Sequence, residues 1–207
     1  MKPQIIDHGH HVAAPLPSGA RRLKVGETLQ LCLGAQELSA QPAFVLEAGA
    51  HLELTVLIFP GQDRNLNVTV DFIGEGATAS LSGLYICSAA DRLSLKVEVR
   101  HRVGGCSSNQ LFRGIVADRA NVTFDGRIVV APEAQKTKAL QACNNILLSA
   151  EAVAQSLPQL EIYADDVECS HGATVGALNT DEQYYMRSRG IPEDEVKVLQ
   201  MISFLSP

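Results

Sequence analysis

Residues 44–162 alternate apolar and polar side chains with almost no helical interruption, and this period of two constrains the fold more than any other feature. Such alternation is typical of strands that bury one face. Gly-containing turns such as Gly104-Gly105 separate the alternating segments. The sequence therefore predicts a mainly β fold. The clearest strand patterns lie at residues 50–56, 66–72, 93–99 and 121–124.

An internal repeat in the sequence distinguishes between the possible β folds. The segment 49–54 recurs as segment 76–81, and weaker echoes lie at 120–124 and 172–175. A step of about 27 residues suits one coil of a parallel β-helix, in which each coil buries its apolar face against its neighbours. The step from Ala77 to Ala120 is longer and requires an insertion. We therefore expect a parallel β-helix whose coils are about 27 residues long.

Composition excludes several classes of partner and compartment. The 17 Lys and Arg against 23 Asp and Glu give a net charge of -6, which argues against nucleic acid or an anionic membrane as the main partner. With 5% aromatic residues and no Trp, the core must consist mainly of small aliphatic side chains. The five cysteines form no Cys-x-x-Cys pair, and no apolar stretch is long enough to span a membrane. These features predict a soluble cytoplasmic protein, and the cysteine spacing gives neither a disulfide framework nor the pattern of a zinc site.

The last residues change character. Asn179 or Thr180 can cap a helix that Gly190 ends, and Pro192 can begin a second helix with an acidic first turn. The second helix carries an apolar stripe. The predicted organisation is an N-terminal segment, a β-helix core and a C-terminal helical pair, at residues 1–43, 44–178 and 179–207. The predicted stripe comprises Val196, Leu199, Ile202, Phe204 and Leu205.

The sequence contains none of the nucleotide-binding, nucleophile-elbow or zinc-protease motifs that would indicate an enzyme. Energy from nucleotide hydrolysis would have to come from a partner. His8, His10 and His11 beside Asp7 have the chemistry of a transition-metal site, although a solvated chain terminus explains them as well.

Residues 160–176 hold the strongest candidate site. In an extended segment Cys169 and His171 point to one face with Cα atoms about 6–7 Å apart, and a thiolate and an imidazole can share iron or zinc. Cys143 precedes them by about one coil, which predicts that it lies on the adjacent rung about 5 Å away. The alternative is that these cysteines are buried apolar residues. The pair Asp165-Asp166 fits a turn better than an acid–base pair.

Three segments in order, 144–149, 163–176 and 185–192, resemble the C-terminal half of the SufB/SufD family of the Suf iron-sulfur cluster assembly system, and SufD more closely than SufB. The resemblance implies a right-handed parallel β-helix, a dimer formed between β-helices, and docking of the SufC ATPase on the C-terminal helices. Cys169 and His171 match the SufD motif. Cys143 falls where SufB carries its sulfur-acceptor cysteine and typical SufD proteins have no thiol, and Gly172 falls where SufB has an acidic residue.

These observations predict a non-enzymatic scaffold of iron-sulfur cluster assembly. The resemblance implies Cys143, Cys169 and His171 as ligands of a transient iron-sulfur cluster or iron, a SufC-like ATPase as partner, and either a SufB-like protein or a second copy as dimer partner. It also implies a longer chain that begins with a helical region. The alternative is a module that dimerises and recruits the ATPase but binds no cluster. A carbohydrate-active β-helix enzyme is disfavoured, because only 10 Phe and Tyr are available as sugar platforms.

Overall fold

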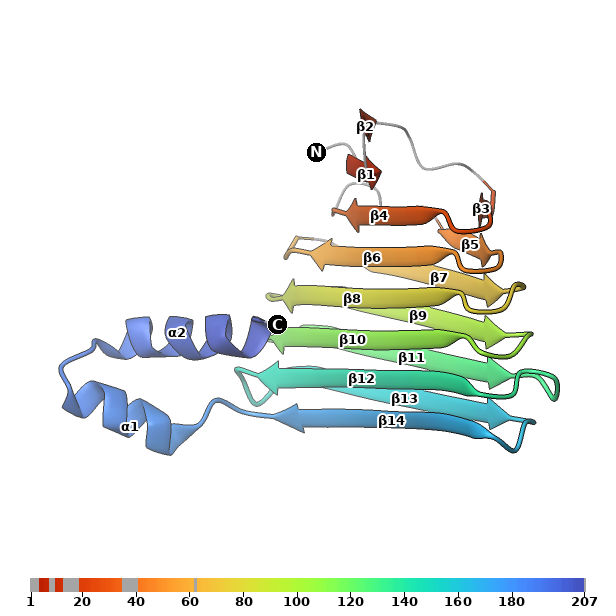
Figure 1. The fold of residues 1–207 in the computed structure, drawn as a ribbon. Coiled ribbons are helices and arrows are strands. Elements are labelled where there is room, and N and C mark those ends of the chain that lie inside the picture. Colours follow the sequence, from red (N-terminus) through yellow and green to blue (C-terminus); the bar gives the residue numbers. More distant parts are fainter. Residues whose placement is uncertain (1–3, 8–9, 13–18, 35–40, 62, 207) are drawn as a thin grey trace.

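The protein, seen in a computed structural model, is a parallel β-helix from which two helices project (Figure 1). The structure describes residues 4–7, 10–12, 19–34, 41–61 and 63–206, with side chains from residue 19 onward. The prediction of a mainly β parallel β-helix followed by two C-terminal helices is confirmed. Among the described residues, no helix has the length and apolarity needed to cross a membrane.

Two sheets form the walls of the β-helix, and after the first two strands the chain passes from one sheet to the other at each successive strand. The first sheet has eight strands in the spatial order β14-β12-β10-β8-β6-β4-β1-β2, and all its pairs are parallel except those that β1 makes with β2 and β4. Its strands are β1 (Gln4–Asp7), β2 (His10–Val12), β4 (Thr28–Leu33), β6 (His51–Ile58), β8 (Thr78–Cys87), β10 (Ser107–Val116), β12 (Thr137–Leu147) and β14 (Val167–Gly176).

The second sheet has six parallel strands in the order β13-β11-β9-β7-β5-β3. Alternate residues of its central strands are buried, as the period of two predicts, and most of them meet the buried residues of the first sheet in one large apolar core, with a smaller cluster at the C-terminal end. Its strands are β3 (Arg21–Leu23), β5 (Ala43–Leu46), β7 (Arg64–Phe72), β9 (Arg92–His101), β11 (Asn121–Val130) and β13 (Val153–Ile162).

The coils lengthen along the chain. The predicted repeat step fits the pairing of β6 with β8, where His51 lies opposite Thr78, but it is wrong elsewhere. Strand length contributes, since it grows from 6 residues in β4 to 10 residues in β8, and the turns account for the later differences, because β8 to β11 are equally long. The register between the strands of the first sheet shows this change in coil length. Its in-register pairs include Thr28 with His51, Thr78 with Ser107, Ser107 with Lys138 and Thr137 with Val167, and no single step relates them.

The repeated glycine of the sequence echo has a conformational cause. Gly49 and Gly76 each lie two residues before the start of a strand, and both adopt the left-handed conformation, with φ of 65° and 72°. A side chain is disfavoured there, so these turns favour glycine, although Lys136 adopts the same left-handed conformation before β12, with φ of 60°. The sequence repeat therefore reflects a turn that recurs at equivalent positions in successive coils of the β-helix.

Helices α1 (Thr180–Ser188) and α2 (Glu193–Leu205) follow β14 and pack against each other beside the β-helix (Figure 1). The Asn179 side chain caps α1 by accepting hydrogen bonds from two backbone N–H groups, as predicted, and α2 begins after Pro192. The predicted apolar stripe of α2 is only partly buried. Val196 is fully buried, whereas Leu199 and Ile202 are about half exposed.

Candidate functional site

At its C-terminal end the β-helix has an uncovered last coil, formed by β13 and β14, which we call the open rung. Strands β13 and β14 lie at the ends of their sheets, and each is paired on one side only among the described strands. Cys169 and His171 pair in register with Ala139 and Gln141, whose side chains point into the core. Side chains in register on adjacent strands point to the same face. Cys169 and His171 therefore occupy interior-facing positions at the end where the interior meets solvent.

Cys169 is half-buried at this end. It packs against a small core cluster that includes Ile128 and Ala139. Burial raises the pKa of the Cys169 thiol, and a hydrogen bond with the backbone of Ala139 only partly offsets this effect. His171 is exposed. The pair thus consists of an accessible imidazole and a thiol that stays protonated until a metal or a base removes its proton.

Cys143 lies one rung further in and is fully buried, with 1% of its surface exposed. Its sulfur accepts hydrogen bonds from Ser156 Oγ at 3.4 Å and from Asn145 Nδ2 at 3.6 Å, and Tyr85 Oη lies 3.6 Å away. The Tyr85 hydroxyl donates to Asn145 Oδ1 at 2.5 Å. Burial and the neighbouring Cys143 raise the pKa of Tyr85 well above its ordinary value. Cys143 is thus the centre of a buried polar network.

The structure corrects the predicted register between Cys143 and the terminal strand. Cys143 does lie on the rung next to β14, but the residue opposite it is Ala173, because the coil here is longer than the sequence repeat indicates. His171 is displaced by two positions along the strand and Cys169 by four, which corresponds to Cα separations of about 8 and 14 Å from strand rise and spacing. The three predicted ligands share the interior face but are not drawn together around one point.

In agreement with this spacing, the described residues contain no group of three or more His, Cys, Asp or Glu that could hold a metal. The side chains of His8, His10 and His11 lie outside the described part of the chain. Asp165 and Asp166 lie in the turn between β13 and β14, where the Asp166 carbonyl accepts from the Lys136 N–H at 2.6 Å. The turn interpretation of this acidic pair is therefore confirmed.

Comparison with known protein families identifies this architecture. Residues 35–204, most of the chain, match the family described as "SUF system FeS cluster assembly, SufBD core domain". The chain belongs to the SufBD family. The expected resemblance to SufB and SufD is thereby confirmed.

Individual SufBD relatives match over parts of their length. The iron-sulfur cluster assembly protein SufD of Escherichia coli is 37% identical over 138 residues, which is 67% of this chain and 33% of the relative. A SufBD family protein of Mycobacterium leprae is 30% identical over 175 residues, 81% of this chain and 44% of the relative. One from Synechocystis is 41% identical over 98 residues, 47% of this chain and 22% of the relative. The chain thus spans less than half the length of each.

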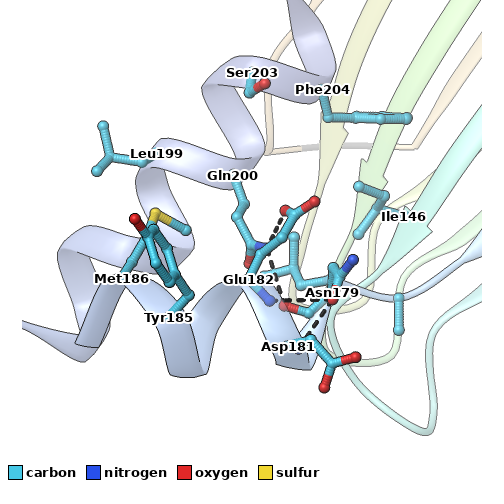
Figure 2. A pocket seen from close by; sticks show the side chains of 12 residues that line it. Ile146, Asn179, Asp181, Glu182, Tyr185, Met186, Leu199, Gln200, Ser203 and Phe204 are labelled. Atoms are coloured by element: carbon cyan, nitrogen blue, oxygen red, sulfur yellow. Dashed lines mark hydrogen bonds between the residues drawn. The ribbon is translucent and has the colours of Figure 1, made fainter. Parts of the chain in front are cut away.

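A second feature of this SufBD chain lies between the helices and the end of β12. A cavity of about 760 Å³ opens there, with Ile146 and Phe204 on one side and Met186 and Leu199 on the other (Figure 2). Gln200 holds its wall by donating to the Asn179 carbonyl at 3.0 Å and to Glu182 at 2.9 Å. The cavity is apolar with a polar floor, which suits an apolar side chain of a partner protein.

Sequence reasoning missed the polar residues of the interior. Gln110, Gln141 and Asn145 are buried, and Gln141 and Asn145 stand on the same face of β12 as Cys143. The available signal was their place in the alternation, because they are polar residues at positions where the period of two calls for apolar ones.

Proposed function

We propose that this chain is a SufD-like, non-enzymatic scaffold of iron-sulfur cluster assembly that pairs with a second β-helix through its open C-terminal rung. The single observation that carries the proposal is the placement of Cys169 and His171 on an interior-facing edge strand that no described strand covers. A cluster is the cargo of such a scaffold, and thiolate and imidazole are ligands that iron-sulfur centres accept.

The open rung has the features of a pairing edge. Strand β14 contains no proline, and its N–H and C=O groups on the outer side can pair with another strand. Interior-facing Val175 is 48% exposed and Ile162 is 39% exposed, although these positions are buried in earlier coils. At the N-terminal end the β1–β2 hairpin covers β4 by antiparallel pairing. A solenoid requires covered ends, and a second chain would cover this one.

The number of cluster-ligating side chains also favours pairing with a second chain. Iron-sulfur clusters are usually held by four protein ligands, whereas one chain brings Cys169 and His171 to the open rung. A SufB-like protein or a second copy would supply the remaining ligands across the interface. Cys143 would act as sulfur acceptor or as a further ligand only after the terminal rung shifts, because its thiol is now buried and hydrogen-bonded.

We assign the docking of a SufC-like ATPase to the helical pair. Tyr185 is 60% exposed and Leu199 is 47% exposed, and both line the cavity beside α1 and α2. Exposed apolar residues clustered around a cavity are typical of a protein-binding surface. Co-purification with the ATPase tests this assignment. Leu199→Glu should abolish it, whereas Val25→Glu, which changes another exposed apolar residue far along the chain, should leave it intact.

Anaerobic reconstitution with iron and sulfide tests the ligand assignment. The chain, alone and mixed with a SufB-like partner, is followed by absorption spectroscopy as wild type and as Cys143→Ser, Cys169→Ser and His171→Ala. We expect a cluster chromophore that each substitution weakens, whereas Cys32→Ser, in β4 near the other end, leaves it unchanged. A colourless wild type in both settings, or a chromophore that survives all three changes, would reject the assignment.

A module that dimerises and recruits the ATPase without holding a cluster is the second candidate. The burial of Cys143 within a hydrogen-bond network favours it, since this is the environment of a structural thiol. Dimer formation and ATPase binding without a chromophore would establish this alternative.

A further inference from the structure

Two glutamines form a polar column inside the apolar β-helix. Gln110 is fully buried and Gln141 is 3% exposed, and Gln141 Nε2 donates to Gln110 Oε1 at 2.9 Å. Gln110 Nε2 and Gln141 Oε1 have no hydrogen-bond partner among the described residues. An unpaired buried polar atom costs about 1–3 kcal/mol, so two of them in one column require an explanation.

The column leads to the candidate site. Gln110 pairs in register with Gln141 on the adjacent rung, and Gln141 pairs in register with His171 on the terminal rung. Adjacent strands are about 4.8 Å apart, so in-register side chains on the same face lie within hydrogen-bonding reach of each other. His171 is the next residue of the column that carries a hydrogen-bonding side chain, and it is the exposed one.

The opposite wall is shaped around the Gln141 amide. A Cβ atom on Gly126 would lie 2.5 Å from both amide atoms of Gln141, so glycine leaves the space that the amide fills. With Gln110 presenting Oε1, the hydrogen bond directs Nε2 of Gln141 inward, because a flip of Gln141 alone would bring two amide oxygens together and lose that bond. The amide oxygen of Gln141 is therefore held in place with its acceptor capacity unused.

We propose that Gln141 is a positioning residue for His171 and that its amide oxygen accepts the ring N–H of the imidazole. Histidine ligands of metals usually donate their second ring N–H to such an acceptor, which fixes the tautomer and directs the other nitrogen to the metal. Gln110 acts one rung further in by orienting Gln141. The role of the column in metal binding rests on the proposed function of His171, whereas the hydrogen bond itself does not.

Long-range proton–nitrogen NMR of the intact chain tests the hydrogen bond, with the His171 signals assigned by their loss in His171→Ala. The test variant is Gln110→Met with Gln141→Met, since replacing both partners by apolar residues of similar shape leaves the fold nearly unaffected. We expect one dominant tautomer of His171 in the wild type and a mixture in the double variant. Gln141→Glu, which retains an acceptor oxygen, should keep a single tautomer. Equal tautomer mixtures in wild type and double variant would overturn the proposal.

Cobalt(II) titration provides the second measurement and separates this proposal from the preceding one. Loss of an outer partner of a histidine ligand typically lowers metal affinity about 10–100-fold, and we expect a decrease of that size in the double variant. If wild type and His171→Ala bind cobalt equally, His171 is not a ligand and the proposed cluster site fails, while the NMR result still decides the hydrogen bond. Affinity that depends on His171 but not on the two glutamines would reject their role.

Discussion

Large and small side chains alternate between neighbouring rungs of the interior. Tyr85 lies opposite Gly114, and Phe112 lies opposite Gly83. A Cβ atom on Gly114 would come within 1.8 Å of the Tyr85 ring, and one on Gly83 within 2.1 Å of the Phe112 ring. The two glycines thus let an aromatic ring extend over the neighbouring rung, and Gly114 in particular lets Tyr85 reach Asn145 and Cys143.

Gly114→Val should therefore destabilise the protein by at least about 1–3 kcal/mol, the usual cost of overfilling a core. The added side chain must displace the Tyr85 ring and with it the hydrogen bonds around Cys143. Denaturant unfolding measures the change. Gly176→Ala is the control, because a Cβ atom there has no neighbour within 4 Å. Equal stabilities of both variants and the wild type would contradict the packing argument.

A buried histidine makes stability depend on pH. His101 is 1% exposed and stacks on Phe72 with ring centroids 4.4 Å apart, and burial lowers its pKa to about 4. In the unfolded chain the imidazole titrates near pH 6.5, so between about pH 6.5 and 4 the unfolded state binds a proton that the native state does not. The contribution of His101 is complete above pH 6.5 and is lost as pH falls.

The loss should approach about 3 kcal/mol near pH 4, because the free energy of unfolding falls by about 1.4 kcal/mol for each pH unit between the unfolded and the native pKa of His101. Urea unfolding at pH 7.5, 6, 5 and 4 measures it, with His101→Gln as the non-titrating variant. We expect a steeper decline of the free energy of unfolding in the wild type than in His101→Gln. Parallel curves would show that His101 does not carry the acid sensitivity.

At the scale of elements, the strands between residues 44 and 162 followed from alternation, and both helices followed from their capping residues, whereas β3 and β4 lie before the region in which alternation was recognised. The register between neighbouring strands could not be predicted in the same way. The pairing of Cys143 with Ala173 depends on how many residues each turn and strand adds to a coil, and the coils lengthen unevenly, with no fixed period. The repeat at Gly49 and Gly76 revealed one turn conformation but not the length of later coils.

The attachment of the C-terminal end of α2 to the sheet was likewise beyond sequence reasoning, because it involves a side chain of a distant strand. Arg113 of β10 donates to the Phe204 carbonyl at 3.1 Å and to the Ser206 carbonyl, at the C-terminal end of α2. A cation at this end also complements the helix dipole. The helical pair is thereby tied to the middle of the first sheet as well as to the end of β14.

Arg113→Ala should loosen α2 without unfolding the β-helix. A hydrogen bond from a charged donor contributes about 1.5–3 kcal/mol, so amide hydrogen exchange in α2 should accelerate roughly tenfold or more. Exchange in β6 and β8 should remain unchanged. Arg22→Ala, which removes an exposed arginine paired with Glu47, is the control. Unchanged exchange in α2 would show that the helices pack without this anchor.

At the scale of the whole molecule, the two ends of the β-helix differ. A hairpin covers the first sheet at the N-terminal end, whereas the C-terminal end leaves interior-facing side chains exposed. The same end carries Cys169 and His171 and lies two strands from the anchor of the helical pair. In the proposed function, partner pairing, cluster ligation and ATPase docking would therefore act on neighbouring parts of the molecule.

A charge at the open edge should prevent pairing. Val175→Lys places an ammonium group among interior-facing side chains that a second β-helix would cover, and an unpaired buried charge costs about 3 kcal/mol or more. The dissociation constant of the dimer, with a SufB-like partner or with a second copy, should rise about 100-fold in analytical ultracentrifugation. Leu140→Lys is the matched control, because Leu140 is equally exposed but lies on the outer face of β12, which is paired on both sides. Dimers that tolerate Val175→Lys, or that dissociate equally in both variants, would place the interface elsewhere on the molecule.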